Sequence, residues 1–245
     1  MSVTGWNVKY NEILEEFGYS RIKDHKSAVL LDSMLKKYPL DNLRKMICKR
    51  PVFVIGAGPS LSSALPVLKK YKKITKICAD TAVTPLIQNG ISPQVVVTDL
   101  DGDLETLRRI GRTDSIMVVH AHGDNYDRLE LARGFRNCIG TTQTRKTGKV
   151  HNFGGFTDGD RCVFLADYFG ASEIFLFGMD FGAKIGRYSD TKRLDRATKL
   201  KKLKYGRTLL EWLAPQAKAN LFTLSKPIRG FKKITYQELK RTIHN

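Results

Sequence analysis

The chain is poor in cysteine. Its four cysteines, Cys48, Cys78, Cys138 and Cys162, are far apart and never form a Cys-x-x-Cys pair. This spacing argues against a cysteine-based zinc site and against a secreted disulfide framework. Each cysteine lies among apolar residues, where a free thiol behaves as a small hydrophobic side chain. We therefore expect reduced thiols and a cytoplasmic location.

Long apolar runs are also missing. Residues 1–11 lack the basic-then-apolar pattern of a signal peptide. No apolar run approaches the roughly 20 residues that a membrane-spanning helix needs. These absences predict a soluble protein without a membrane partner.

Acidic residues are scarce, with 24 Asp and Glu against 42 Lys and Arg, which gives a net charge of +18. Such a charge favours anionic partners, including nucleotides, polyphosphates, nucleic acid or a membrane surface. The basic residues lack interleaved aromatics and any signature of a nucleic-acid-binding fold. We expect no stable nucleic-acid partner, although a basic nucleic-acid-binding protein stays as an alternative. The sequence leaves the oligomeric state open, and a homodimer is possible.

The pattern of apolar runs predicts an α/β fold. Residues 1–50 have helical apolar stripes, one of which is Val29, Leu30, Met34 and Leu35. Asp41 can cap a short third helix that runs to Arg50. We interpret this region as an N-terminal cap or substrate lid. Residues 51–245 alternate helical stretches with short runs that are apolar along their length, typical of parallel strands buried on both faces. The expected strands are 52–55, 74–79, 95–98, 116–120, 174–177 and 221–224. We predict a mostly parallel, Rossmann-like, three-layer sheet, with its ligand site beyond the carboxyl ends of the strands.

A glycine-rich loop follows the first expected strand. Gly56 and Gly58 let backbone approach a ligand closely, Pro59 suits the first turn of a helix, and Ser60 offers a hydroxyl. A helix beginning here would present free N–H groups to a phosphate. The loop is neither a Walker A motif nor a complete Gly-x-Gly-x-x-Gly motif. It predicts a nucleotide contact, or else a tight turn without a ligand.

An aspartate ends the second expected strand. Asp80 can bind a ribose hydroxyl or a magnesium-bound water, or it can cap the following helix. Asp180 occupies the equivalent place after the fifth strand. Capping would explain each segment alone, but it explains less easily why acidic or glycine-rich segments follow all five principal strands.

The most informative segment is TDLDGD (98–103), after the third expected strand. Asp99, Asp101 and Asp103 place three carboxylates within five residues, and their repulsion needs a cation or donors to offset it. Magnesium prefers a few carboxylates together with waters and substrate phosphates. A spacing of two places Asp99 and Asp101 on one side of an extended backbone. We predict a magnesium or magnesium-nucleotide site, the alternative being a solvated turn with Asp103 as a helix cap.

Two histidines follow the fourth expected strand. His120 and His122 share one face of an extended segment, with Asp124 nearby. A transition-metal site would need such a third ligand. The adjacent aspartates suit a hard cation better, so we predict a polar contact with the ligand. Histidines with purely structural hydrogen bonds are the alternative.

The segment HNFGGFTDGDR (151–161) combines glycines, aromatics, carboxylates and an arginine ahead of a helix. Its two phenylalanines can stack on a flat heterocycle. Thr157 or Asp158 can cap the helix, and Asp158 or Asp160 can add to the metal site. Thr157 and Arg161 are candidate ligand contacts. A flexible capped loop is the alternative.

A long basic helix is predicted over residues 191–213. It can be a solvated face, or it can help to clamp a triphosphate. Lys184, Arg187 and Arg193 are the candidates for that clamp, in or near the preceding loop.

Taken in order, GAGPSL (56–61), TDLDGD (98–103), HAHGDN (120–125) and NFGGFTDGDR (152–161) resemble the archaeal 6-hydroxymethyl-7,8-dihydropterin pyrophosphokinases. The resemblance covers nearly the whole chain, and the family's core looks like that of thiamine pyrophosphokinase. It implies transfer of diphosphate from ATP to the pterin hydroxymethyl group, with release of AMP, in folate or methanopterin biosynthesis.

The same resemblance implies roles for individual residues. Asp99, Asp101 and Asp103 would hold Mg²⁺ on the ATP phosphates, and Asp158 and Asp160 would complete that site. The loop from Gly56 to Ser60 would face the nucleotide. Gly-x-Gly-Pro-Ser-Leu also occurs in proteins that resemble sialyltransferases, so a nucleotide-sugar-dependent glycosyltransferase is a further alternative.

Overall fold

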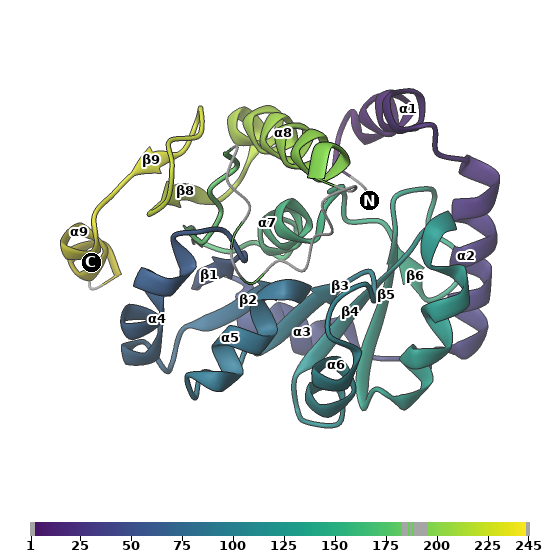
Figure 1. The fold of residues 1–245 in the computed structure, drawn as a ribbon, viewed down its shortest axis with the longest axis horizontal. Helices are drawn as coiled ribbons and strands as arrows, with labels where there is room; N and C mark the ends of the chain where they lie inside the picture. The colour runs from purple at the N-terminus through teal and green to yellow at the C-terminus, as the bar shows by residue number, and fades with distance from the viewer. Residues whose placement is uncertain (1–2, 183–185, 187, 189–195, 244–245) are drawn as a thin grey trace.

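The computed structural model describes residues 3–182, 186, 188 and 196–243. Its centre is a nine-stranded sheet with the strand order β6-β5-β4-β3-β2-β1-β7-β8-β9, in which every pair of neighbours is parallel (Figure 1). Parallel neighbours direct all the carboxyl ends to one edge of the sheet. The predicted α/β, Rossmann-like fold is therefore confirmed.

Six of the strands lie where the apolar runs predict them, within one or two residues at each end. They are β1 (Pro51–Ile55), β2 (Thr75–Ala79), β3 (Val95–Thr98), β4 (Ile116–Ala121), β7 (Glu173–Phe177) and β8 (Asn220–Thr223).

The sequence analysis missed three strands: β5 (Asn137–Thr142), β6 (Val150–His151) and β9 (Lys232–Lys233). β5 ends in Gly-Thr-Thr, so its buried positions do not form an apolar run, although most of the strand is buried. β6 and β9 are two residues long and lie at the outer edges of the sheet, where sequence patterns carry little signal.

Helices cover both faces of the sheet, so the fold has three layers with the sheet in the middle. They are α1 (Trp6–Phe17), α2 (Arg21–Met34), α3 (Leu40–Ile47), α4 (Leu61–Lys70), α5 (Val83–Gln88), α6 (Leu104–Gly111), α7 (Asp158–Tyr168), α8 (Arg196–Leu213) and α9 (Tyr236–Ile243), with a 3-10 segment, η2, over Gly123–Gly134.

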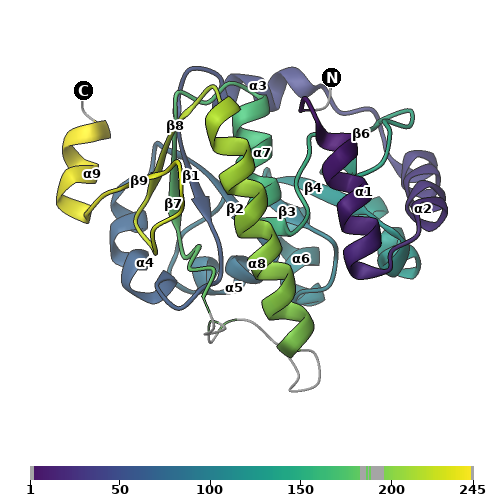
Figure 2. The same cartoon turned by 90° about the horizontal axis from the view of Figure 1, so that it is seen from above.

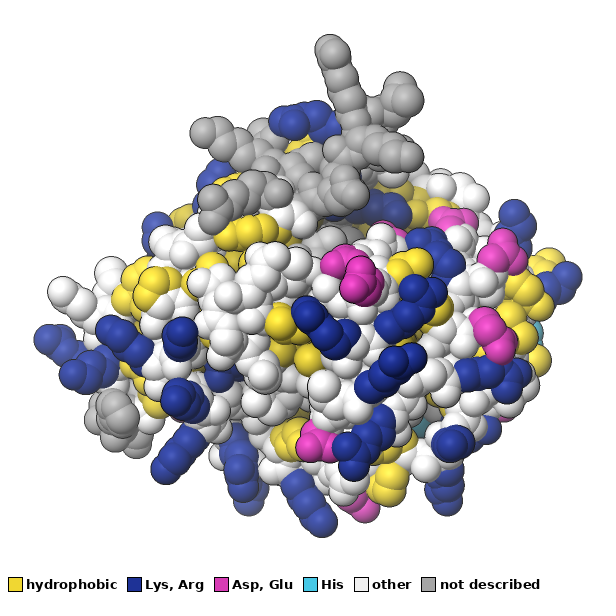
Figure 3. All heavy atoms as spheres, turned by 60° about the horizontal axis from the view of Figure 1, so that its bottom comes forward, with side chains coloured by type: hydrophobic (Ala, Val, Ile, Leu, Met, Phe, Trp, Pro, Cys, Tyr) yellow, Lys and Arg dark blue, Asp and Glu magenta, His cyan; other side chains and the backbone are white. Residues whose placement is uncertain are grey.

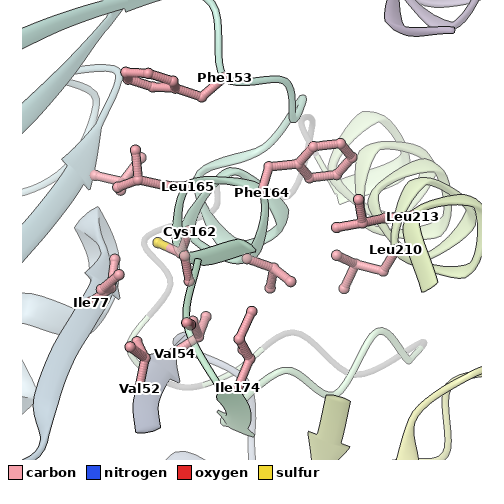
Figure 4. Close-up of a cluster of buried hydrophobic side chains, with 14 of the residues drawn as sticks. Val52, Val54, Ile77, Phe153, Cys162, Phe164, Leu165, Ile174, Leu210 and Leu213 are labelled. Atoms are coloured by element: carbon pink, nitrogen blue, oxygen red, sulfur yellow. The ribbon is translucent and has the colours of Figure 1, made fainter. Parts of the chain in front are cut away.

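Alternate strand residues divide the core into two hydrophobic clusters. One cluster joins strand residues such as Val52 and Val54 to α1, α3, α7 and α8. The other joins Phe53 and Ile55 to α2, α4, α5, α6 and α9. Figure 4 shows how Val52 and Val54 lie below Cys162 of α7, with α8 packed on the far side of that helix. This packing of helices on the sheet fixes the carboxyl ends of the central strands, where the sequence motifs lie.

The helical N-terminal region packs into the same core as the sheet. Trp6, Tyr10 and Ile13 of α1 are buried in the first cluster. Tyr205 of α8 donates a hydrogen bond to a Glu12 carboxylate oxygen of α1 at 3.1 Å, and Figure 2 shows the two helices side by side. A domain boundary near residue 50 stays a prediction, and so does the role of this region as a lid.

Two details of the N-terminal prediction are corrected. Val29, expected in the apolar stripe of α2, is 48% exposed, because α2 instead buries Ala28 and Leu31. α3 begins after Pro39, so Asp41 lies in its first turn and is not its cap.

The surface carries the excess of basic residues. Lys and Arg side chains are dispersed over the face in Figure 3, with Asp and Glu side chains among them. Among the residues that the structure describes, no helix is long and apolar enough to cross a membrane.

Candidate active site

A cavity of about 450 Å³ opens at the carboxyl edge of the sheet. The ends of β1, β3, β4 and β7 contribute to its walls, together with the segment before α7 and one side of α8. Of the predicted site residues, the lining includes Gly56, Gly58, Asp99, Asp101, His120, His122, Thr157 and Asp158. The structure thus gathers segments from over 100 residues of sequence around one hollow.

Four carboxylates meet beside this cavity. Asp80, Asp99, Asp101 and Asp158, hereafter the acidic cluster, each offer an oxygen, and these oxygens all lie within 4.8 Å of one another. The Oδ1 atoms of Asp80 and Asp99 are both buried without a hydrogen-bond partner. Buried carboxylate oxygens normally have donors, so this arrangement fits a hard divalent cation that takes oxygen ligands.

We expected an extended backbone from Asp99 to Asp101, but the structure has a turn there. Leu100 between them has φ 66°, in the left-handed region that leucine rarely adopts. Thr98 stabilises the turn, because its Oγ1 accepts a hydrogen bond from the Leu100 amide at 2.8 Å and donates one to Asp80 at 2.5 Å. Both carboxylates still face the acidic cluster.

The electrostatics of the acidic cluster favour bound protons or a cation. Burial raises the pKa of Asp80 to about 6. Burial and then the negative charge of Asp99 raise the pKa of Asp101 to about 7. Burial and the neighbouring carboxylates raise the pKa of Asp158 well above its ordinary value. Burial also acts to raise the pKa of Asp99, but its interactions with His122 and Asp101 outweigh it and lower that pKa.

Asp103 and Asp160 were predicted as metal ligands, and the structure places both outside the acidic cluster. Asp103 is exposed and caps α6, where it accepts hydrogen bonds from the Glu105 and Thr106 amides. Asp160 is fully buried and accepts from the Phe156 and Thr157 amides, each at 2.7 Å. Their oxygens already have donors, so helix capping accounts for both residues.

The glycine loop lines the cavity, but the Asp180 carboxylate already lies at the N-terminus of α4, the helix that follows the loop. The Ser60 amide and hydroxyl donate to Asp180 Oδ2 at 2.9 and 3.0 Å. A side chain at Gly58 would come within 2.3 Å of the same Asp180 oxygen. Gly58 is therefore required for the approach of Asp180, and the Ser60 amide is not free for a phosphate.

The two histidines stack on each other, with ring centroids 5.6 Å apart. His122 Nε2 lies 3.5 Å from Asp99 Oδ2. His122 also caps η2, because its Nδ1 accepts a hydrogen bond from the Asp124 amide. His120 is 2% exposed, and its Nε2 is buried without a partner. Burial lowers the pKa of His120 well below its usual value, so this ring is neutral.

The segment before α7 divides between structure and cavity. Thr157 caps α7 and also lines the cavity. Arg161 is buried, and its Nη2 donates to the Phe156 carbonyl at 2.7 Å. Of the two phenylalanines, Phe156 lines the cavity, while Phe153 lies in the core.

Within the described residues, α8 contributes basic side chains to the cavity lining. Lys199 and Lys202 are among its lining residues. The Lys202 ammonium lies 5.7 Å from the centre of the Tyr19 ring. Lys184, Arg187 and Arg193, which we expected to clamp a triphosphate, lie outside the described residues.

Comparisons with known proteins decide the family. The sequence profile of the family described as "6-hydroxymethylpterin diphosphokinase MptE-like" matches residues 27–186. The chain belongs to this family. A relative from Pyrococcus furiosus, named 6-hydroxymethyl-7,8-dihydropterin pyrophosphokinase, is 44% identical over 90% of this chain and 97% of its own length.

Two further relatives carry the same name. The protein from Methanocaldococcus jannaschii is 40% identical over 87% of this chain and 96% of its own. The protein from Methanothermobacter thermautotrophicus is 41% identical over 87% of this chain and 95% of its own. The family resemblance stated from the sequence motifs is confirmed.

A solved structure shares the fold of this MptE-like chain. It is the MAf glycosyltransferase from Magnetospirillum magneticum AMB-1, with a TM-score of 0.55 and 16% sequence identity. The match covers 91% of this chain but spans only 40% of that protein. At this identity the likeness concerns the fold alone.

Among the cavity residues of this family member that sequence reasoning did not predict are Tyr19, Gln143, Lys199 and Lys202. Tyr19 lies between α1 and α2, in the region that we interpreted as an N-terminal cap or substrate lid. Gln143 follows β5, which the sequence did not reveal as a strand. The only signal available was the basic run around Lys202, and its alternative interpretation was a solvated face.

Proposed function

We propose that the protein is a 6-hydroxymethyl-7,8-dihydropterin pyrophosphokinase that transfers diphosphate from ATP to the pterin hydroxymethyl group and releases AMP. Three relatives with this name, at 40 to 44% identity, support the activity. The structural observation that carries the proposal is the acidic cluster, with two unpartnered buried oxygens beside a cavity at the carboxyl edge of the sheet.

We assign a divalent cation, Mg²⁺, to the acidic cluster. Its donors are all carboxylate oxygens, the set that Mg²⁺ prefers over softer nitrogen and sulfur ligands. When bound, the ion supplies positive charge that offsets the negative charge of the ATP phosphates. His122, 3.5 Å from Asp99, helps to hold that carboxylate in place.

We infer from the order of the strands that the two substrates bind on opposite sides of the acidic cluster. The acidic cluster occupies the ends of β2 and β3 and the start of α7. On one side of it lie the ends of β1 and β7 with Gly56, Gly58 and Asp180, and on the other lie the ends of β4 and β5. We place the nucleotide on the β1 and β7 side, with Lys199 near its phosphates, and the pterin on the β4 and β5 side.

In this arrangement the chain acts mainly by positioning. The pterin hydroxymethyl oxygen attacks the β-phosphorus, the bond between the α,β-bridging oxygen and the β-phosphorus breaks, and AMP leaves with that oxygen. The hydroxyl proton passes to a cluster carboxylate, and Asp101 is the most exposed of the four. Holding both reactants in line lowers the entropic part of the barrier.

The setting of the reaction is also part of the proposal. We place the product in tetrahydrofolate or tetrahydromethanopterin biosynthesis and the enzyme in the cytoplasm. A homodimer stays possible.

The test is the release of AMP by the purified protein with ATP, Mg²⁺ and 6-hydroxymethyl-7,8-dihydropterin. We expect AMP and the pterin diphosphate in equal amounts, and none when the pterin or Mg²⁺ is left out. No AMP from the complete mixture would refute the assignment. Transfer from a nucleotide sugar without a pterin would instead support the glycosyltransferase alternative.

A further inference from the structure

Gln143 lies just beyond β5, on the side of the cavity where we place the pterin. Its backbone carbonyl accepts hydrogen bonds from the Trp6 indole at 2.8 Å and from Asn152 Nδ2 at 3.1 Å. Its side-chain Nε2 donates to Asp24 Oδ2 at 2.9 Å. The residue is 3% exposed, so these contacts hold it rigidly in the cavity wall.

Asp24 determines which way the Gln143 amide points. Asp24 is 2% exposed, and its oxygens also accept from the Tyr10 hydroxyl at 2.7 Å and from the Gly123 amide at 2.8 Å. Burial raises the pKa of Tyr10, so its hydroxyl stays protonated and donates. Asp24 Oδ2 accepts the hydrogen bond from Nε2, so the NH₂ group of the Gln143 amide faces Asp24 and Oε1 is the amide's remaining polar atom.

Aromatic side chains also line this cavity. Tyr19 and Phe156 both line it, and their ring centroids are 6.3 Å apart. A pterin is a flat, neutral heterocycle whose amino-pyrimidine edge carries N–H donors. Aromatic walls and a fixed oxygen acceptor match the face and the edge of such a ring, and they offer nothing specific to a triphosphate.

We propose that Gln143 Oε1 accepts a hydrogen bond from the 2-amino group of the pterin and thereby selects this substrate. Asp24 acts as a positioning residue, since it holds the Gln143 amide by a hydrogen bond, and Tyr10 acts in turn through its hydrogen bond to Asp24. This inference rests on the proposed function, and it gives the N-terminal helices a part in substrate choice.

The first test compares the pterin with its 2-oxo analogue, 6-hydroxymethyl-7,8-dihydrolumazine, in the wild-type enzyme. We expect kcat/KM to be about 100-fold lower for the analogue, because its 2-oxo group places an acceptor opposite the Gln143 oxygen, where the 2-amino group of the pterin places a donor. Equal kcat/KM values for the two compounds would overturn the inference without needing any variant.

The second test uses Gln143→Met, which keeps the volume and removes the amide. We expect KM for the pterin to rise about 10-fold or more, KM for ATP to stay within twofold, and most of the discrimination against the analogue to disappear. Asp24→Asn should also raise KM for the pterin, because the Gln143 amide can then rotate. The rise should be smaller than in Gln143→Met, because the amide oxygen is still present. Gln216→Met, at an exposed position remote from the cavity lining, is the matched control and should change neither KM.

These outcomes separate the two proposals. If the wild type makes no AMP with the pterin, the proposed function fails. If the wild type is active and Gln143→Met keeps the wild-type KM for the pterin and the wild-type preference over the analogue, only the role of Gln143 fails. A Gln143→Met protein that raises both KM values equally would also contradict a role specific to the pterin.

Discussion

Leu100 shows at the scale of a single residue how the site is built. A leucine in the left-handed region costs about 1–2 kcal/mol, and here it lets Asp99 and Asp101 face the same point. The sequence predicted that these carboxylates act together, but from an extended backbone. The turn depends on the Thr98 hydroxyl, which accepts a hydrogen bond from the Leu100 amide and donates one to Asp80. No local sequence pattern indicates the contact between Thr98 and Asp80.

The acidic cluster and the neighbouring cap differ in their expected response to the same substitution. Asp101→Asn removes a carboxylate of the acidic cluster, so we expect AMP release to fall about 100-fold or more. Asp103→Asn is the matched control, because asparagine also caps helices well, and it should leave activity and stability nearly unchanged. Equal losses of activity in the two variants would show that Asp103 belongs to the site.

The raised pKa values predict how pH affects the chelated protein. Asp80 and Asp101 hold protons more tightly when folded, so their contribution to the free energy of unfolding is present below about pH 4. It is lost as the pH rises toward about 7. Mg²⁺ replaces the lost protons, so we expect it to raise Tm more at pH 8 than at pH 5. Thermal melts with EDTA or with Mg²⁺ measure this, and an equal shift at both pH values would contradict it.

At the scale of elements, the glycine loop is held by the segment after β7. Both segments were recognised in the sequence as strand ends, but their contact was not, because Ser60 and Asp180 are 120 residues apart. Likewise, Asp103 and Asp160 matched the acidic motifs, although their local hydrogen bonds make them caps. Composition indicates which segments are acidic, and only the packing of the elements shows which oxygens are left without donors.

Gly58→Ala tests this clamp. The added methyl group would lie 2.3 Å from Asp180 Oδ2 and 2.5 Å from the Gly178 carbonyl, so the loop must shift. We expect a lower Tm and a KM for ATP raised several-fold, with KM for the pterin little changed. Gly134→Ala, where nothing lies within 4 Å of the added carbon, is the control. Unchanged ATP kinetics in Gly58→Ala would place the nucleotide elsewhere.

At the scale of the whole molecule, the order of the strands arranges the chemistry along one edge. The sequence predicted most of this, because six strands and the parallel arrangement follow from apolar runs and intervening helices. It did not predict the cavity wall beyond β4, because β5 and β6 lack an apolar run. Gln143 and its link to the N-terminal helices were missed for that reason.

The net charge of +18 predicts a salt effect that differs between the two substrates. Basic side chains attract the polyanionic ATP, and salt screens that attraction over a Debye length of about 10 Å at 0.1 M. We expect kcat/KM for ATP to fall as KCl increases, while kcat/KM for the neutral pterin stays nearly constant. The pterin measurement is the internal control, and parallel decreases would indicate a general effect of salt on the enzyme.

The central claim is that the acidic cluster binds a divalent ion together with ATP phosphates. The direct measurement is anomalous diffraction from crystals soaked with Mn²⁺ and α,β-methylene-ATP, which cannot be cleaved at the reacting position. The account predicts a manganese peak bonded to oxygens of the acidic cluster and to the phosphates. A peak elsewhere, with these carboxylates facing solvent and the phosphates bound away from them, would contradict it.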